Sequence, residues 1–465
     1  MPSRGHRLER GALLSPIEIC IMIMEWYWAL ILMLGSVVGL MFLGLPVAFA
    51  FFGANILGVF LFMRGDIGLT LMPIEYVFSI SKFTLVPVAL FVLMGEILFQ
   101  TGMAFRAITA IDRLISRVPG RLSVVAIAGG TVFSSLSGST IANTAILGSV
   151  MLPDMLKRGY DPKIAMGPIM AVGGIAMLIP PSALAVLLAS LAERSIKDLL
   201  IAGILPGAAM AVLFVAYVVI RCRLSPGLAP LEELPADGTA QVRGWQRWRP
   251  FVFDVLPLFT IFVVVVGSIF FRIAAPEEAS ALGCVAAVIV CACYGELSWP
   301  KLMKALRETA KINVMILFII AGSLTFSQVL QISGATGGLL QEVSAWSLTP
   351  LTAMLLMMAV LLFLGAFMDQ ISMMLLTLPF FLPMADGLGM NTIWLMVMML
   401  IAMEISLLTP PFGLLLYIMK GVAPASIRLS QIYAAAMPFI ALELLVMVFL
   451  IVFPSIAIWL PSLIR

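Results

Sequence analysis

Long apolar stretches fill most of this chain, and short polar or charged segments separate them. Runs of about 20 apolar residues, such as the one within 251–271, are long enough as helices to cross the hydrocarbon core of a bilayer. The strands of a transmembrane barrel would instead show short segments of alternating polarity. The pattern therefore predicts an all-α polytopic membrane protein with about ten spanning helices, at residues 25–43, 46–63, 85–101, 164–191, 198–221, 251–271, 279–295, 312–332, 391–419 and 430–453.

Two further apolar segments, 123–153 and 350–384, have polar or helix-breaking residues at their centres. The first contains the hydroxyl-rich run 134–140, and the second contains Gly365 and the pair Asp369-Gln370. Non-helical backbone is tolerated at membrane depth only where protein or a water-filled cavity surrounds it. We therefore predict that both segments are re-entrant hairpins.

The apolar pattern also repeats within the chain. Pro180-Pro181 and Pro410-Pro411 stand 230 positions apart, each inside an apolar segment, and the same shift carries Pro153 onto Pro383. Proline lacks a backbone donor and breaks a helix. Paired broken helices in two halves of a membrane protein point to the binding site of a transporter. We predict a first repeat at 24–221 with hairpin 123–153, a linker at 222–250, and a second repeat at 251–465 with hairpin 350–384.

Basic residues give the two halves an orientation, because cytoplasmic loops are enriched in Lys and Arg. Placing 106–121 in the cytoplasm places four more basic segments there, and together they hold 18 of the 27 Lys and Arg residues; the other four are 157–163, 221–249, 301–311 and 420–428. The first hairpin then enters from the cytoplasm and the second from outside, so the repeats are inverted. The basic tail 1–23 would lie outside, against the rule, and we hypothesise that it is not native.

Two stretches with one apolar and one charged face flank the predicted spans, at 105–118 and 301–311. Helices with such faces lie in the plane of the membrane interface. We interpret them as a pair of arms that tether a moving unit to a fixed one.

Composition argues against several classes of function. The chain is 62% hydrophobic and 11% charged, with a mean hydropathy of +1.14. We predict no nucleic-acid partner, and the net charge of +3 is too small to indicate one. The single histidine, His6, lies in the tail, which argues against histidine-dependent zinc or acid–base catalysis. No Gly-x-x-x-x-Gly-Lys-Ser/Thr loop for nucleotide phosphates occurs. Uphill transport would then depend on an ion gradient, and we predict that the chain is not an enzyme.

Oxygen-bearing residues gather at the hairpin centres and the proline breaks. Hydroxyls, an amide and freed carbonyls suit a small cation and an anionic substrate, and charges at membrane depth are functional by default. Glu96, Glu278 and Glu443 are weaker candidates than Asp369 and Glu404. The predicted substrate-binding residues are Ser137, Ser139, Thr140, Asn143, Ser182, Asp369 and Thr409, and the predicted cation ligands are Ser137, Gly138, Ser139, Gly174, Pro180, Gly365, Asp369, Glu404, Ser406 and Thr409.

From about Met24 onward the chain resembles the large membrane subunit of tripartite ATP-independent periplasmic (TRAP) transporters. The motifs that carry the resemblance, in order, are 44–49 (GLPVAF), Ser137-Gly138-Ser139 with Ala142, Gly159-Tyr160, 179–182 (IPPS), 202–207 (AGILPG), 276–279 (PEEA), Gly365 with Asp369, and 404–413 (EISLLTPPFG). The chain departs from the family pattern at Ala176, Glu277, Ala402 and Ser406, and the last two border the expected sodium site, so the number of sodium ions stays open.

The resemblance implies sodium-coupled import of an organic acid (a dicarboxylate, sialic acid or sugar acid) by elevator-type scaffold and transport domains in the bacterial inner membrane. It also implies co-transported sodium ions, a small four-helix membrane subunit, and a soluble periplasmic substrate-binding protein that captures the substrate. Three alternatives stay open. They are a stand-alone sodium/dicarboxylate symporter, a passive channel and, least favoured by the residues, an intramembrane enzyme.

Overall fold

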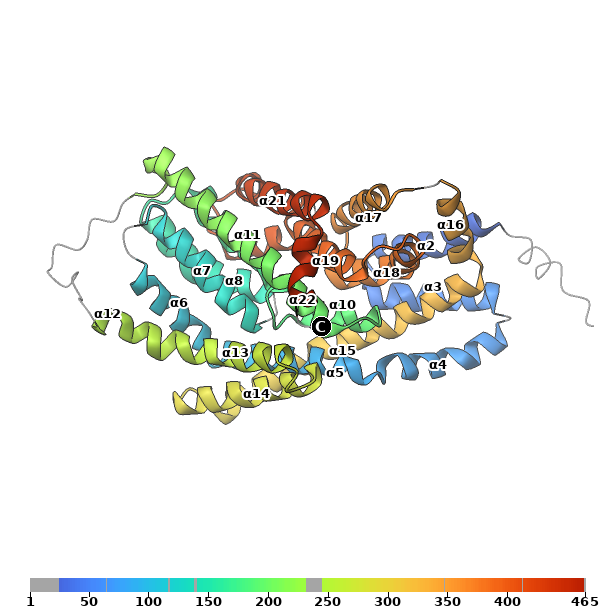
Figure 1. Ribbon diagram of the computed structural model, residues 1–465, viewed down its shortest axis with the longest axis horizontal. Helices are drawn as coiled ribbons and strands as arrows, with labels where there is room; N and C mark the ends of the chain where they lie inside the picture. Colours follow the sequence, from blue (N-terminus) through green and yellow to red (C-terminus); the bar gives the residue numbers. More distant parts are fainter. Residues whose placement is uncertain are drawn as a thin grey trace, which may run out of the picture. The chain divides into compact units, whose positions relative to one another are not determined.

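The computed structural model describes residues 25–63, 65–115, 118–137, 140–230, 245–346, 348–411 and 413–463. Every regular element in this part of the chain is a helix (Figure 1), which confirms the all-α polytopic class. The tail 1–23 and residues 231–244 of the predicted linker lie outside the described residues. The chain divides into two compact units, one formed by residues up to 80 with 318–347 and the other by 81–317 with 348–465.

The first unit packs its helices closely at small residues. A methyl group at Gly58 would overlap Val329, and the amide of Asn55 donates a hydrogen bond of 2.7 Å to the Gly322 carbonyl. The buried rings of Phe51 and Phe326 meet edge to face at 5.3 Å. These contacts fasten α3 to the end of α15. The helices of this unit are α2 (Trp26–Phe42), α3 (Val47–Phe62), α4 (Asp66–Ile80), α16 (Ala335–Ala345) and the last part of α15 (Trp299–Ile332).

The second unit holds the predicted hairpins and broken helices, together with the first part of α15. Its remaining helices are α5 (Val86–Gln100), α6 (Met103–Leu114), α7 (Arg121–Ser137), α8 (Thr140–Lys157), α9 (Pro162–Leu178), α10 (Ala183–Leu191), α11 (Ile196–Leu224), α12 (Trp245–Pro250), α13 (Leu256–Phe270), α14 (Pro276–Cys293), α17 (Pro350–Gly365), α18 (Gln370–Gly387), α19 (Thr392–Leu408), α20 (Leu414–Val422), α21 (Leu429–Val452) and α22 (Ser455–Ser462).

Helices α9 and α19 form the centre of this unit. Every residue of α9 from Ile164 onward is buried, and so is every residue of α19 from Ile393 onward. A helix that is apolar all round belongs in a core. Hairpin helices α7 and α8 lie side by side (Figure 1) and pack on α9, whereas α17 and α18 pack on α19.

Both central helices end at a proline pair. Ile179 and Thr409 leave helical geometry with nearly the same backbone angles, φ −89° and ψ 121° against φ −84° and ψ 122°. The chain then resumes as α10 and α20, and α10 is bent from α9 by 43°. The predicted breaks at Pro180-Pro181 and Pro410-Pro411 are therefore confirmed.

The 230-residue shift extends from the prolines to whole elements. It carries the bounds of α8 onto those of α18 and the bounds of α9 onto those of α19, without a residue of slippage. With slippage of a few residues it also relates α2 to α13, α3 to α14, α6 to α16, and α11 to α21. The helix order of the second half thus repeats that of the first. The inverted relation of the halves and their boundaries stay predictions.

Some elements differ from the sequence prediction. Six described helices are long and apolar enough to span a bilayer, or seven with the bent pair α9–α10 counted as one, and α2, α3, α17 and α19 are shorter apolar helices. The stretch 301–311 is no separate interfacial helix, because α15 runs without a break from Trp299 to Ile332. Helices α4, α16 and α22 lie outside the predicted spans, since charge, glycine or proline interrupts their apolar pattern.

Candidate functional site

A buried carboxyl group lies where the two hairpins meet the broken helices. Glu404 is in α19, four residues before the helix ends, and its side chain is fully buried. Its Oε1 accepts hydrogen bonds of 3.3 Å from the Thr140 hydroxyl and 3.3 Å from the Gln370 amide. Thr140 is the first residue of α8 and Gln370 the first of α18, so one carboxyl oxygen joins the tips of both hairpins.

The repeat explains this arrangement. The shift of 230 carries Thr140 onto Gln370, so the two donors occupy equivalent positions. The same shift carries Gly174 of α9 onto Glu404 of α19. One half therefore supplies the carboxylate and the other supplies the smallest residue. A methyl group at Gly174 would lie 3.4 Å from Glu404 Cβ and 3.5 Å from Glu404 Oε2, so the glycine leaves room for the acidic side chain.

The predicted ligands Gly365 and Ser406 are also adjacent. A methyl group at Gly365 would overlap the Ser406 side chain, so only glycine permits α17 to end against α19 here. The Ser406 hydroxyl donates a hydrogen bond of 2.7 Å to the Ala402 carbonyl, one turn earlier in the same helix. That bond leaves the hydroxyl lone pairs available to a cation.

Asp369 caps the second hairpin helix. Its carboxylate accepts hydrogen bonds from the backbone N–H groups of Ile371 (3.1 Å) and Ser372 (3.2 Å), and from the Ser372 hydroxyl. This is the usual way in which an acidic N-cap satisfies the first turn of a helix. Sequence reasoning assigned Asp369 to ligand binding alone and missed its capping role, although Asp before an apolar helix is a capping signal.

The remaining predicted residues lie along the breaks and the first hairpin tip. Ser182 is buried and caps α10, because its hydroxyl accepts a hydrogen bond from the Ala185 N–H. The Thr409 hydroxyl donates a hydrogen bond of 2.7 Å to the Ile405 carbonyl, one turn earlier. Asn143 is buried in α8, three residues after Thr140. Pro180 lies in the first break. Gly138 and Ser139 lie outside the described residues, as does the side chain of Ser137.

The structure thus joins Thr140, Gly173, Gly174 and Glu404 into one cluster, with the Thr140 hydroxyl also 3.4 Å from the Gly173 carbonyl. Gln370 belongs to this cluster and was missed as a ligand, although its position opposite Thr140 in the repeat could have identified it. Among the described residues, no three His, Cys, Asp or Glu side chains lie close enough together to hold a metal ion. The donors are hydroxyl, amide, carbonyl and carboxylate oxygens, which suit a hard cation rather than a transition metal.

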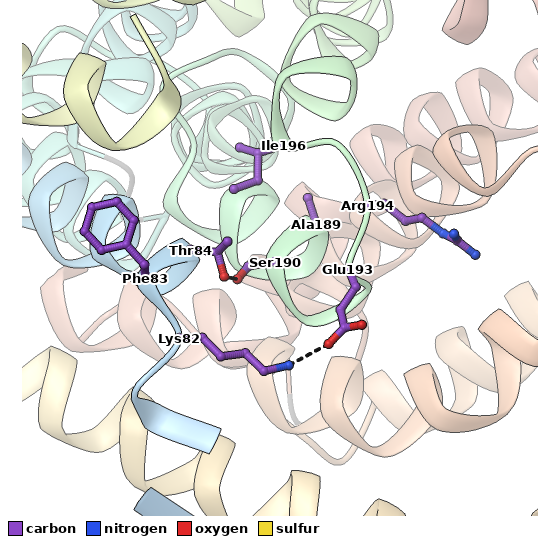
Figure 2. Close-up of a pocket in the computed structure, with 8 residues that line it drawn as sticks. All are labelled: Lys82, Phe83, Thr84, Ala189, Ser190, Glu193, Arg194 and Ile196. Atoms are coloured by element: carbon purple, nitrogen blue, oxygen red, sulfur yellow. Dashed lines mark hydrogen bonds and ion pairs between the residues drawn. The ribbon is translucent and has the colours of Figure 1, made fainter. Parts of the chain in front are cut away.

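A pocket of about 480 Å³ opens elsewhere in the second unit, beside the loop between α10 and α11 (Figure 2). Glu193 in this loop accepts an ion-pair hydrogen bond of 2.7 Å from Lys82, and Arg194 donates to both oxygens of Asp386 at 2.9 and 2.7 Å. The hydrogen bond and the charge of Lys82 lower the pKa of Glu193 below its ordinary value. None of the predicted site residues lines this pocket.

Known proteins resemble the chain over nearly its full length. The family model of the tripartite ATP-independent periplasmic transporter, DctM component, matches residues 34–456. The C4-dicarboxylate TRAP transporter large permease protein of Pseudomonas aeruginosa is 29% identical over 82% of this chain and 87% of its own. The sialic acid TRAP transporter large permease protein of Vibrio cholerae is 28% identical, and the ectoine counterpart of Halomonas elongata 27%, each over 93% of this chain and 99% of its own.

Solved structures share the fold at low identity. The YdaH transporter of Alcanivorax borkumensis superposes with a TM-score of 0.57 at 15% identity, over 85% of this chain and 89% of its own. MtrF of Neisseria gonorrhoeae also superposes with a TM-score of 0.57, at 14% identity, over 85% of this chain and 84% of its own. The family match spans both hairpins, both broken helices and the Glu404 cluster. The chain therefore belongs to the large permease subunits of the TRAP transporters, which are multi-pass membrane proteins.

Proposed function

We propose that this chain carries an organic acid across the bacterial inner membrane together with sodium ions, as the large membrane subunit of a binding-protein-dependent transporter. The observation that supports the proposal most is the buried oxygen cluster around Glu404, which joins both hairpin tips to both central helices. A cation bound among these oxygens would interact with both hairpins at once. Its binding would then be coupled to the hairpin arrangement that holds the substrate.

Similarity to known transporters leaves several substrates open. Relatives of nearly equal identity have names that refer to C4-dicarboxylates, sialic acid and ectoine, so similarity to this chain does not select one of them. We infer that a soluble periplasmic binding protein performs the selection, and that a small four-helix membrane subunit completes the membrane complex. In the described parts of α8, α9, α18 and α19, no Lys or Arg lies near the Glu404 cluster, so helix N-termini, hydroxyls and co-bound cations would face the substrate anion.

Uptake into proteoliposomes tests the proposal. The full chain is reconstituted with its small subunit, and labelled dicarboxylate, sialic acid or sugar acid is presented with the cognate binding protein. We expect uptake only with both an inward sodium gradient and the binding protein. Each monovalent cation that enters down about 100 mV contributes roughly 2.3 kcal/mol, so imposing a negative interior should raise uptake further.

Two results would change the assignment. Sodium-dependent uptake without the binding protein would place the chain with stand-alone symporters. Uptake that is indifferent to sodium under every imposed potential would refute the cation coupling.

A further inference from the structure

A second buried carboxyl group, Glu443, faces the Glu404 cluster from α21. Its side chain is fully buried in the middle of a membrane-spanning helix. Neither of its carboxyl oxygens has a hydrogen-bond partner within the described part of the chain, and Glu404 Oε2 has none either. Oxygens of this kind are costly to bury unless a partner satisfies them.

Two of these three oxygens, one from each carboxyl group, lie beside Gly174 of α9. A methyl group at Gly174 would lie 3.0 Å from Glu443 Oε1 and 3.5 Å from Glu404 Oε2. Both carboxyl groups therefore pack against α9 in the place that a side chain at position 174 would need. Glu404 has two distinct sides in this arrangement, because Oε1 faces the hairpin donors and Oε2 faces Glu443 and the glycine.

In the described parts of the helices that carry these residues and the hairpin tips, no basic side chain lies beside the pair. Helices α18, α19 and α21 contain no Lys or Arg in their described parts. In α8 and α9 the basic residues lie at the helix ends, and none occurs between Ile164 and Leu191. Two carboxylates in a low-dielectric interior repel each other and attract any small cation that reaches them. Carboxylate oxygens are hard ligands that suit such a cation.

We propose that Glu443 and Glu404 hold an alkali cation between their unpartnered oxygens, beside Gly174 of α9. Glu443 is then a direct ligand on α21, outside the hairpins and the proline breaks. The inference deepens the proposed function, on which it rests for the identity of the cation as sodium. It adds a site on the side of Glu404 that turns away from the hairpin tips.

Equilibrium binding of ²²Na⁺ to the purified full chain tests this site without substrate or binding protein, with choline chloride keeping the ionic strength constant. We expect Glu443→Gln, which keeps the side-chain shape, to weaken one class of sodium sites at least tenfold or to remove one ion from the bound stoichiometry. Gly174→Ala retains both carboxyl groups, but its methyl group would lie 3.0 Å from Glu443 Oε1 and displace that carboxyl group from Glu404, so it should have the same effect. The matched control is Glu75→Gln, which makes the same chemical change at a half-buried position in α4 and should leave the isotherm unchanged.

The outcomes separate this site from the proposed function. Wild-type isotherms for both Glu443→Gln and Gly174→Ala would overturn the site, even if sodium drives uptake and the proposed function stands. An isotherm that depends on Glu443 while sodium fails to drive uptake would keep the site and refute the proposed coupling. A carboxyl pair that takes up protons, but whose substitution leaves sodium binding intact, would also overturn it. If Glu443→Gln does not elute as a monodisperse protein, Gly174→Ala carries the test.

Discussion

The contact between Gly203 and the end of α9 gives a sharp test of how the first proline break is held. Gly203 lies in α11, and a methyl group there would overlap the carbonyl oxygen of Leu178, the last residue of α9. The same methyl group would lie 3.1 Å from the Leu178 carbonyl carbon and 3.2 Å from its Cα. Carbon atoms in contact normally stay about 3.5–4.0 Å apart. The obstacle is backbone, which cannot rotate away as a side chain could.

Gly203→Ala should therefore push α11 away from the break. Added atoms in a packed core cost about 1–3 kcal/mol, and the upper part of that range is expected where backbone must move. The loss should appear as a lower apparent Tm of the detergent-purified protein, measured by size-exclusion chromatography after heating. Because the displaced residue precedes Pro180-Pro181, uptake in proteoliposomes should fall as well.

The control is Gly267→Ala in α13, where a methyl group would meet no atom within 4 Å. Alanine is favoured over glycine in a helix by roughly 0.5–1 kcal/mol, so this variant should keep or raise Tm. If Gly203→Ala matches Gly267→Ala in both Tm and uptake, the close approach of α11 to α9 does not constrain the break and the reasoning is wrong.

Three further predictions concern the charged residues. The lowered pKa of Glu193 means that its ion pair with Lys82 stabilises the fold fully above the ordinary pKa of a Glu side chain, 4.5, and that this contribution disappears as pH falls through the lowered value. Glu193→Gln should lower Tm slightly at pH 7, and this deficit should shrink as the pH falls below 4.5; a deficit that stays constant on acidification would contradict this. Arg194→Ala should lose the two-point contact with Asp386, and a double-mutant cycle with Asp386→Ala should give a coupling of about 0.2–1 kcal/mol, as for other exposed pairs. Zero coupling would mean that the pair does not hold the loop. Asp369→Asn should retain the cap of α18 and most of the stability, whereas Asp369→Ala should lose about 1 kcal/mol; if both abolish uptake with normal expression, the carboxylate serves transport as well as capping.

Much of the secondary structure follows from the sequence alone. The lengths of the apolar runs correspond to helices such as α11 and α21, and α9 and α19 each end two residues before a proline pair. Such signals are local, because a proline breaks its own helix wherever the helix packs. The continuous α15 was harder to predict, since Lys301 to Lys311 carries the charges of an interfacial segment while its backbone continues into an apolar helix.

The candidate site was only partly readable from the sequence. Glu404, Thr140 and Gly174 were identified from the hairpin and the break, but their meeting at one carboxyl group was not. Gln370 and Glu443 were underrated, because a Gln beside an Asp and a lone Glu in an apolar helix have no distinctive spacing. Their importance depends on which atoms face them from helices far away in the sequence.

The sequence by itself determined the membrane class, the broken helices, the 230-residue repeat and the family, because these depend on composition, proline chemistry and periodicity along the chain. Only the tertiary structure decided that Thr140 and Gln370 meet at one oxygen of Glu404, and that Glu443 lies beside Gly174. The reason is physical. The energy of a buried carboxyl group is set by the few atoms within hydrogen-bonding distance, and helix packing, not sequence order, brings those atoms together.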